Sequence, residues 1–286
     1  MKPSKGDERL DLELVKRGIA ESRNRAQALV MAGDVRVNGE KVVRPGAKVS
    51  PDAIIEISGE SRWAGRGAYK LLKALDVFPV DPSGRICIDI GASTGGFTDV
   101  LLDRGAKRVY CVDVGYGQLA WRLRNDERVV VMERTNARYL EPGHLSDVPE
   151  IATMDVSFIS VTKILPAVEA LLAPDGDCIA LVKPQYEAGK GLVGKKGVIR
   201  DRRLHRGILI SLSLFTRSMD KMALMGADFS PILGPSGNIE FLFHLRKGGV
   251  PPAGLDEAFF GDLVEKAHCE LVEVRDKKAS KGGSQG

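Results

Sequence analysis

The sequence predicts an α/β fold in which a seven-stranded, mostly parallel, doubly wound sheet follows a small α+β unit. Apolar strand-like segments alternate with helical patterns from residue 65 to about residue 247, as they do in parallel sheets covered by helices. A glycine-rich turn follows the first of these strands. The last two strands have no long helix between them, which favours an antiparallel hairpin at the end of the sheet.

Length and composition indicate a two-domain protein without a membrane partner. The chain has 286 residues, of which 43% are hydrophobic, and a formal net charge of +4. This charge is compatible with nucleic acid but is weak evidence by itself. No apolar run approaches the roughly 20 residues that span a bilayer. Because the start also lacks an apolar signal segment, we expect a cytoplasmic protein. The histidines have no ligand spacing, so no metal is expected.

Residues 1–60 are predicted to form the first domain. We expect a short helix that ends near Gly18, a helix capped by Ser22, a hairpin over 35–43 and a closing strand at 54–57. The hairpin turn is an Asn-Gly pair, which favours a two-residue turn. Two short helices and a tiny sheet give a marginal but feasible core.

The order of small and charged residues in this domain resembles the S4 RNA-binding domain over residues 8–57. The residues that carry the resemblance are Arg9-Leu-Asp11, Gly18, Ser22-Arg23, Ala26, Gly33 and Val35-x-Val-Asn-Gly39. The resemblance implies docking on structured RNA. A solvated charged face is the alternative, because residues 1–60 carry 11 basic and 10 acidic side chains, so the charge must be segregated. The residues assigned to RNA are Arg17, Arg23, Arg25, Arg36, Lys41, Arg44 and, beyond this domain, Arg66.

Three further segments complete the organisation. We expect a linker at 61–64, an α/β domain at 65–250, and a C-terminal helix followed by a disordered Gly/Ser/Lys-rich tail within 251–286. The predicted strands are 85–90, 108–113, 128–132, 151–154, 177–183, 228–233 and 239–246, and the predicted helices are 66–76, 96–104, 117–124, 160–172, 202–225 and 254–275.

The run from Ile86 to Phe97 predicts a cofactor loop, because a β-branched strand leads into a glycine-rich turn and a helix. The G-x-G-x-x-G spacing of dinucleotide folds is absent. Asp89 would repel a pyrophosphate but suits the cationic amino-acid end of S-adenosylmethionine. Asp113, 22 positions after Gly91, suits the ribose hydroxyls. A generic NAD loop or a plain tight turn are the alternatives. The assigned residues are Asp89, Gly91, Ala92, Ser93, Thr94, Gly95, Gly96, Phe97, Asp113, Val114, Asn136 and Asp155.

Four ionisable residues predict the catalytic centre. Asp155 and Lys183 end strands, and Glu240 begins an antiparallel one, so the topology brings all three to one edge of the sheet. Lys70 could reach this edge from its helix. A ribose 2′-hydroxyl is a poor nucleophile that needs a base. We therefore assign Lys183 as the base, Lys70 as its cationic neighbour, and the two carboxylates as orienting groups. Each residue also has an ordinary interpretation, such as a solvated lysine or a helix cap.

Enzymes that methylate other acceptors are expected to carry different sequence motifs. Enzymes that methylate exocyclic amines usually carry Asn/Asp-Pro-Pro-Tyr where this chain has Asp155-Val-Ser-Phe158. Enzymes that methylate carbon 5 of cytosine need a cysteine nucleophile at a strand end. Cys178 begins its strand and is interpreted as a core residue.

The catalytic set and the loop Asp89-Ile-Gly-Ala-Ser-Thr-Gly-Gly-Phe-Thr98 resemble the FtsJ-type ribose methyltransferases, which have the class I fold. The preceding S4 domain, Met154–Ser160 and Val182–Glu187 resemble the TlyA family. The resemblance implies S-adenosylmethionine-dependent 2′-O-methylation of cytidine in 16S and/or 23S ribosomal RNA. The expected partner is ribosomal RNA or a ribosomal subunit, without an obligate protein partner.

Two other functions stay open from the sequence. One is a non-catalytic ribosome-assembly or RNA-binding factor, although the intact catalytic set argues against it. The other is a membrane-lytic protein, because the family is also labelled haemolysin, although no lytic amphipathic helix is evident. The segment 189–197, which follows Lys183, is either a lid that grips RNA or a solvated loop.

Overall fold

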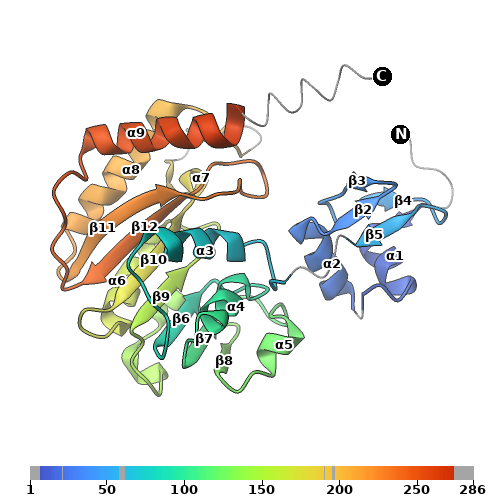
Figure 1. The fold of residues 1–286 in the computed structure, drawn as a ribbon, viewed down its shortest axis with the longest axis horizontal. Helices are drawn as coiled ribbons and strands as arrows, with labels where there is room; N and C mark the ends of the chain where they lie inside the picture. The colour runs from blue at the N-terminus through green and yellow to red at the C-terminus, as the bar shows by residue number, and fades with distance from the viewer. Residues whose placement is uncertain (1–6, 21, 58–61, 190, 195–196, 274–286) are drawn as a thin grey trace.

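The computed structural model describes residues 7–20, 22–57, 62–189, 191–194 and 197–273 (Figure 1). In the N-terminal part, helices α1 (Leu10–Lys16) and α2 (Arg23–Ala32) pack on small sheets. A three-stranded sheet has the order β3-β2-β5, and β1 pairs with β4. The strands are β1 (Glu8–Arg9), β2 (Val35–Val37), β3 (Glu40–Lys41), β4 (Lys48–Val49) and β5 (Ile55–Ile57).

The predicted hairpin of this part is confirmed. Asn38 and Gly39 both have positive φ, at 51° and 80°, as a two-residue hairpin turn requires. The Asn38 side chain accepts a hydrogen bond from the backbone N–H of Ile54 at 2.8 Å, which ties the turn to the third strand. The β1–β4 pair was not predicted, because two-residue strands carry no periodic signal.

The large sheet has seven strands in the order β11-β12-β10-β9-β6-β7-β8. The five neighbouring strands β10, β9, β6, β7 and β8 are parallel to one another. Strand β12 pairs antiparallel with both β10 and β11. The predicted fold class is therefore confirmed. The strands are β6 (Ile86–Ile90), β7 (Arg108–Val112), β8 (Val129–Met132), β9 (Ile151–Met154), β10 (Asp177–Val182), β11 (Met222–Phe229) and β12 (Phe241–Lys247).

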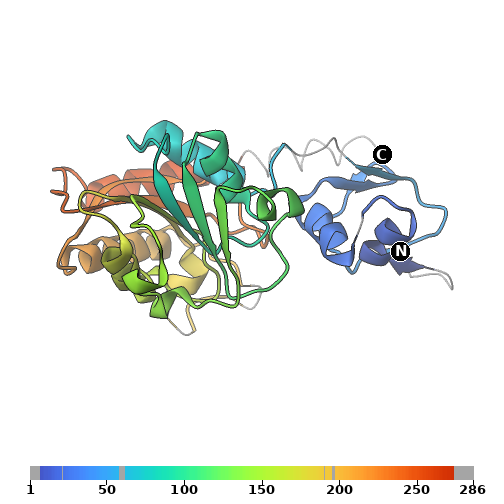
Figure 2. The same ribbon diagram turned by 90° about the horizontal axis from the view of Figure 1, so that it is seen from below.

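Helices cover both faces of this sheet, and Figure 2 shows the teal α3 above it and the orange α8 below it. One apolar core lies under α6, α8 and α9, and a second lies under α3, α4 and α5. The helices are α3 (Ala68–Val77), α4 (Gly96–Asp103), α5 (Trp121–Arg124), α6 (Leu165–Leu171), α7 (Pro184–Glu187), α8 (Arg202–Arg217) and α9 (Glu257–His268). Shorter turns are η1 (Ala137–Tyr139), η2 (Pro142–His144), η3 (Val161–Lys163) and the π-turn η4 (Cys269–Glu273).

Two predicted elements are wrong at the end of the sheet. The helix predicted over 202–225 ends at Arg217, and the strand predicted over 228–233 instead occupies Met222–Phe229. The run after Lys221 is rich in Met, Ala and Leu, which favour helix locally. Pairing along the whole length of β12 overrides this preference. The helix predicted over 117–124 begins only at Trp121, since Gly117 takes a positive φ of 66° and Ala120, with a ψ of 137°, is not helical.

The end of the expected linker is packed onto the large domain. Trp63 and Ala64 are buried in the core under α3 and α4. The backbone N–H of Ala64 donates to Asp99 of α4 at 2.7 Å, and Arg122 contacts the same carboxylate. The predicted C-terminal helix is present as α9 and η4, whereas the tail from residue 274 lies outside the described residues. The domain limits themselves stay predictions.

Candidate active site

The four predicted catalytic residues meet at the carboxyl ends of the parallel strands. Asp155 directly follows β9, and Lys183 directly follows the neighbouring β10. Glu240 directly precedes β12, whose antiparallel pairing with β10 brings its start to the same edge. Lys70 reaches them from the first turn of α3. The sequence left the position of Lys70 open, and the structure places it in the cluster.

Asp155 lies between the two lysines of this cluster. Its Oδ1 is 2.5 Å from Lys183 Nζ, and its Oδ2 is 3.6 Å from Lys70 Nζ. Lys70 Nζ is also 2.6 Å from Glu240 Oε2. Lys70, Lys183 and Glu240 are buried. The cluster is therefore a chain in which lysine and carboxylate side chains alternate and each lysine contacts a carboxylate.

Electrostatics give two members of the cluster fixed charges. Burial by itself would lower the pKa of Lys70, but the carboxylates of Asp155 and Glu240 outweigh it, so the net pKa is raised. Burial would likewise raise the pKa of Asp155, but the two lysines outweigh it and lower that pKa. At neutral pH Lys70 is therefore an ammonium and Asp155 a carboxylate. Lys70 can orient a hydroxyl but cannot accept its proton.

Two side chains of the loop after Asp155 escaped the sequence prediction. Lys183 Nζ donates to Ser157 Oγ at 2.8 Å, which gives this amine a second partner besides Asp155. Phe158 is 89% exposed, and its ring centroid lies 5.1 Å from that of Tyr186. Phe158 has a φ of 65°, a left-handed conformation that is a genuine outlier for a bulky side chain. Neither the conformation nor the contact with Tyr186 can be read from residue type and spacing.

Glu187 fixes the loop that carries these residues. Its carboxylate accepts from Ser160 Oγ at 2.5 Å and from the backbone N–H of Val161 at 2.9 Å. Burial raises the pKa of Glu187. The loop after Asp155 is therefore bonded to α7, the helix that begins directly after Lys183.

The glycine-rich loop is pressed against the end of β9. Gly91 and Gly95 have φ of 83° and 95°, a region that favours glycine. A Cβ on Gly91 would lie 2.5 Å from the carbonyl oxygen of Asp155, and one on Gly95 would lie 2.3 Å from a methyl group of Leu123. The cofactor loop and the catalytic cluster are thus in direct contact.

Asp89 and Phe97 face the protein interior, which corrects the expectation of direct contact with the cofactor. Asp89 is fully buried and accepts from the backbone N–H and hydroxyl of Thr98 and from the hydroxyl of Thr153. Burial raises the pKa of Asp89 to about 6. Phe97 is also buried, in the core under α3. Both residues support the loop and the start of α4 from the interior of the protein.

The other predicted cofactor residues lie at the same edge of the sheet. Asp113 follows β7, and its two carboxylate oxygens accept from the backbone N–H groups of Ser93 and Gly115 at 2.8 and 2.7 Å. Val114 and Asn136 are exposed, and the Asn136 side chain caps η1. Ala92, Ser93, Thr94, Gly95 and Gly96 form the loop itself. A donor that carries a ribose fits this combination of small residues and Asp113.

The basic residues predicted to bind RNA fall into two groups. Arg36, Lys41 and Arg44 are exposed, and no described acidic side chain pairs with them. Arg17 instead contacts Glu13 and donates to the carbonyls of Pro51 and Ala53, and Arg23 contacts the buried Asp11. The side chain of Arg25 lies outside the described residues. Arg66 is partly exposed, just before Lys70.

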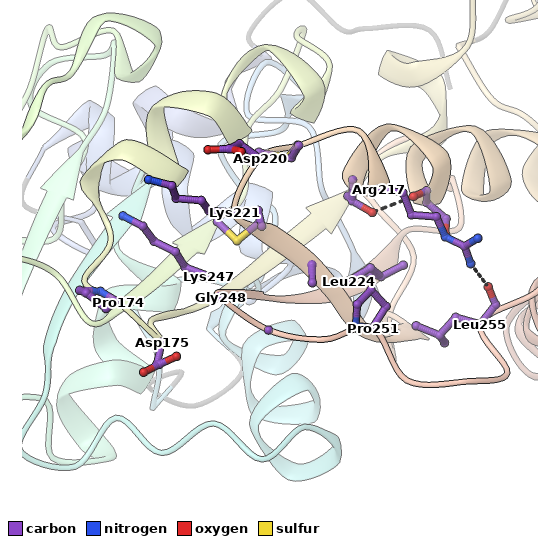
Figure 3. Close-up of a pocket in the computed structure, with 16 residues that line it drawn as sticks. Pro174, Asp175, Arg217, Asp220, Lys221, Leu224, Lys247, Gly248, Pro251 and Leu255 are labelled. Atoms are coloured by element: carbon purple, nitrogen blue, oxygen red, sulfur yellow. Dashed lines mark hydrogen bonds between the residues drawn. The ribbon is translucent and has the colours of Figure 1, made fainter.

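A cavity of about 680 Å³ lies at the opposite, amino-terminal edge of the parallel strands. Figure 3 shows Lys221 and Lys247 extending to one side of it, away from Arg217. Lys247 donates to the carbonyl of Leu172, and Arg217 donates to that of Leu255. These two cations thus contact the backbone, and the cavity contains none of the predicted site residues.

Two features of the described residues bear on other functions. Within these residues, no group of three or more His, Cys, Asp or Glu is arranged to hold a metal ion. No helix in the described part of the chain is both long and apolar enough to cross a membrane.

Comparison with known proteins identifies two domains. Residues 63–247 match the FtsJ-like methyltransferase family, and residues 8–55 match the S4 domain. "Putative rRNA methyltransferase YqxC" of Bacillus subtilis is 50% identical over 94% of this chain and 96% of its own length. "16S/23S rRNA (cytidine-2'-O)-methyltransferase TlyA" of Mycobacterium tuberculosis is 47% identical over 83% of this chain and 89% of its own length.

A solved structure agrees with the whole architecture. The "Putative hemolysin from Streptococcus thermophilus" is 43% identical, with a TM-score of 0.74 over 97% of this chain and 100% of that one. Its likeness covers both parts of the chain, so the order of the two domains is shared. The chain therefore belongs to the FtsJ-like methyltransferase family, with an S4 domain in front of the methyltransferase domain and S-adenosylmethionine as its cofactor.

Proposed function

We propose that this protein transfers a methyl group from S-adenosylmethionine to the ribose 2′-hydroxyl of a cytidine in 16S and/or 23S ribosomal RNA. The single observation that carries the proposal is Asp155 between Lys70 and Lys183, directly against the glycine-rich loop. The cytidine and the ribosomal RNA rest on the relatives, since the M. tuberculosis protein named above carries both in its name. We expect the reaction to take place in the cytoplasm, where ribosomal subunits are assembled.

In this mechanism Lys183 is the general base. When bound, the cofactor would supply an electrophilic methyl group, and the methyl–sulfur bond would break to leave S-adenosylhomocysteine. Lys183, as a neutral amine, would take up the proton of the attacking hydroxyl. Asp155 and Ser157 hold two of the directions around Lys183 Nζ. The remaining direction is left for the acceptor. Lys70, kept cationic by Asp155 and Glu240, orients the hydroxyl oxygen and stabilises the charge that develops on it.

The S4 domain would bring the RNA to this centre. Its exposed cations Arg36, Lys41 and Arg44, which have no described acidic partner, would contact phosphates, whereas Arg17 holds its own domain together. Binding should weaken with salt because neutralised phosphates release counterions. The retained catalytic cluster argues against a purely non-catalytic RNA-binding factor, which would not need two buried lysines beside a methyl-donor loop.

The test is tritiated methyl transfer to purified 30S and 50S subunits by wild type, Lys183→Ala and Lys107→Ala. Lys107 is an exposed lysine at the opposite edge of the sheet and serves as the matched control. We expect label in ribosomal RNA with wild type and Lys107→Ala, none with Lys183→Ala, and cofactor affinity within a few-fold in all three. A labelled nucleotide that resists alkaline hydrolysis would identify the 2′-oxygen.

Two results would contradict the proposal. Label in neither subunit, with cofactor binding intact, would remove ribosomal RNA in these particles as the substrate. Wild-type transfer by Lys183→Ala would remove Lys183 as the base while leaving the rest of the proposal in place.

A further inference from the structure

Two arginines beyond the ends of β7 and β8 have no acidic partner. Arg134 and Arg138 are exposed, and no described carboxylate lies within ion-pair distance of either. Arg124, which contacts Glu133 just before Arg134, is by contrast paired with a carboxylate. Arg134 and Arg138 thus offer unneutralised charge at this rim.

Each of these arginines lies over an exposed tyrosine ring instead. Arg134 Cζ is 4.3 Å from the ring centroid of Tyr116, and Arg138 Cζ is 5.5 Å from that of Tyr139. The two tyrosines are 66% and 67% exposed. Such cation–π contacts fix the planar guanidinium without neutralising it. We call Tyr116, Arg134, Arg138 and Tyr139 the β8 rim.

The backbone holds the β8 rim in a set conformation. Arg134 has a φ of 54°, which is uncommon for a residue other than glycine. Its N–H donates to the carbonyl of Gly115, and the next N–H, of Thr135, donates to that of Asp113. The side chain of Asn136 accepts from the N–H of Arg138 and so starts the turn that carries Tyr139. Such strain persists where the surrounding structure over-determines it, typically at functional sites.

The β8 rim adjoins both the cofactor loop and the S4 domain. Asp113, which accepts from the glycine-rich loop, lies three residues before Tyr116. The segment just after Tyr116, from Gly117 to Trp121, lines one cavity together with Ser22, Asn24 and Ala28 around helix α2. The segment after Tyr116 thus lies against the S4 domain, and the segment before it contacts the cofactor loop.

We propose that the β8 rim binds a single-stranded stretch of RNA that runs from the S4 domain to the catalytic cluster. This proposal rests on the proposed function, because it assumes that RNA is the substrate. Unneutralised guanidinium groups suit phosphates, and exposed ring faces suit unstacked bases, which is the combination used for single-stranded RNA. The rim would bind the RNA between the S4 domain and the catalytic cluster and so set the path of the RNA strand, without touching the reacting atoms.

The first experiment measures equilibrium binding of purified 16S and 23S ribosomal RNA at 50 to 200 mM KCl, which needs no methyl transfer. The variant is Arg134→Asn with Arg138→Gln, since asparagine tolerates the left-handed backbone at position 134. The control is Arg104→Ala, an exposed arginine at the far end of α4. We expect the variant to bind roughly tenfold more weakly, and the slope of log affinity against log salt to become shallower by about 1.4, the value for two phosphates of a single strand.

The second experiment separates stacking from general disruption. Tyr139→Phe keeps the ring, and Tyr139→Ala removes it. We expect Tyr139→Phe to bind as wild type, and Tyr139→Ala to bind about tenfold more weakly, the size of one lost base–aromatic stack. Cofactor affinity should stay unchanged in both variants, which shows that the cofactor loop is intact.

The failure of this inference differs from the failure of the proposed function. Wild-type affinity and salt slope in the double variant, or equal binding by Tyr139→Ala and wild type, would remove the β8 rim from RNA recognition, whatever the methyl-transfer result. Absence of methyl transfer by the wild type would overturn the proposed function, yet a weaker and less salt-dependent double variant would still support the rim as an RNA-binding surface.

Discussion

Glu240 Oε2 lies 2.6 Å from Lys70 Nζ and joins helix α3 to the start of the antiparallel strand β12. Both residues are buried, so the contact is screened little by solvent. It links an element that precedes the cofactor loop in the chain to one that comes about 150 residues after it. Glu240 therefore acts as a positioning residue, since it holds the charge and direction of Lys70.

We predict that Glu240→Gln lowers kcat by about 10- to 100-fold, less than the roughly 100- to 1,000-fold that is lost when an oriented donor is itself removed. The amide keeps the shape of the side chain but removes a charge that raises the pKa of Lys70. The KM for the cofactor should change by less than threefold. Glu141→Gln, at an exposed position, is the control in the same transfer assay. An unchanged kcat in Glu240→Gln would show that Asp155 alone is sufficient to orient Lys70.

A second prediction concerns the glycine-rich loop. Gly91→Ala should abolish cofactor binding and methyl transfer, because its Cβ would lie 2.5 Å from the Asp155 carbonyl oxygen. Gly84→Ala is the matched control, since its φ of 70° is similar but no atom lies within 4 Å of the added Cβ. It should cost only the backbone strain of about 1–2 kcal/mol.

Calorimetric titration of the cofactor and urea unfolding would check this pair of variants. Both should lose some free energy of unfolding, but only Gly91→Ala should lose the cofactor. If Gly91→Ala binds the cofactor as well as Gly84→Ala does, the close packing of the loop on β9 is not required for binding.

The catalytic cluster could be predicted because strand ends are readable in the sequence. Asp155 and Lys183 each close an apolar run, and the order of parallel strands then places them together. The direction of Asp89 could not be read in this way. A carboxylate before a glycine-rich turn can face the ligand or the interior, and the hydroxyls of Thr98 and Thr153 draw it inward.

Contacts between separate elements were the other feature that could not be predicted from the sequence. Ser157 and Phe158 matter through Lys183 and Tyr186, which lie more than 20 residues later. The β8 rim depends on a positive φ at Arg134, which residue type does not announce. Strand β11 was predicted too late in the chain, at 228–233, because its first residues favour helix and only pairing with β12 decides their conformation.

The last prediction concerns pH and the packing of α9. His205 of α8 and His268 of α9 are buried, with His205 Nδ1 2.9 Å from His268 Nε2. His205 also lies edge-on to Phe241. Burial, followed by the neighbouring His268, lowers the pKa of His205 to about 4, while Asp201 opposes the shift. The folded protein therefore keeps His205 neutral under conditions where the unfolded chain, with an ordinary pKa of about 6.5, becomes protonated.

Because the folded pKa of His205 is depressed, its contribution to stability is complete above pH 6.5 and is lost as the pH falls toward 4. Over that window the loss amounts to about 3 kcal/mol at most. Asp89 acts in the opposite direction, since its raised pKa favours the folded state as it takes up a proton near pH 6. The measurement is therefore a difference: urea unfolding of wild type and His205→Phe at pH 7.5 and pH 5. The wild type should lose about 2 kcal/mol more than the variant on acidification, from 1.36 kcal/mol per pH unit below 6.5. Equal losses in the two proteins would mean that His205 is protonated in the folded state at pH 5.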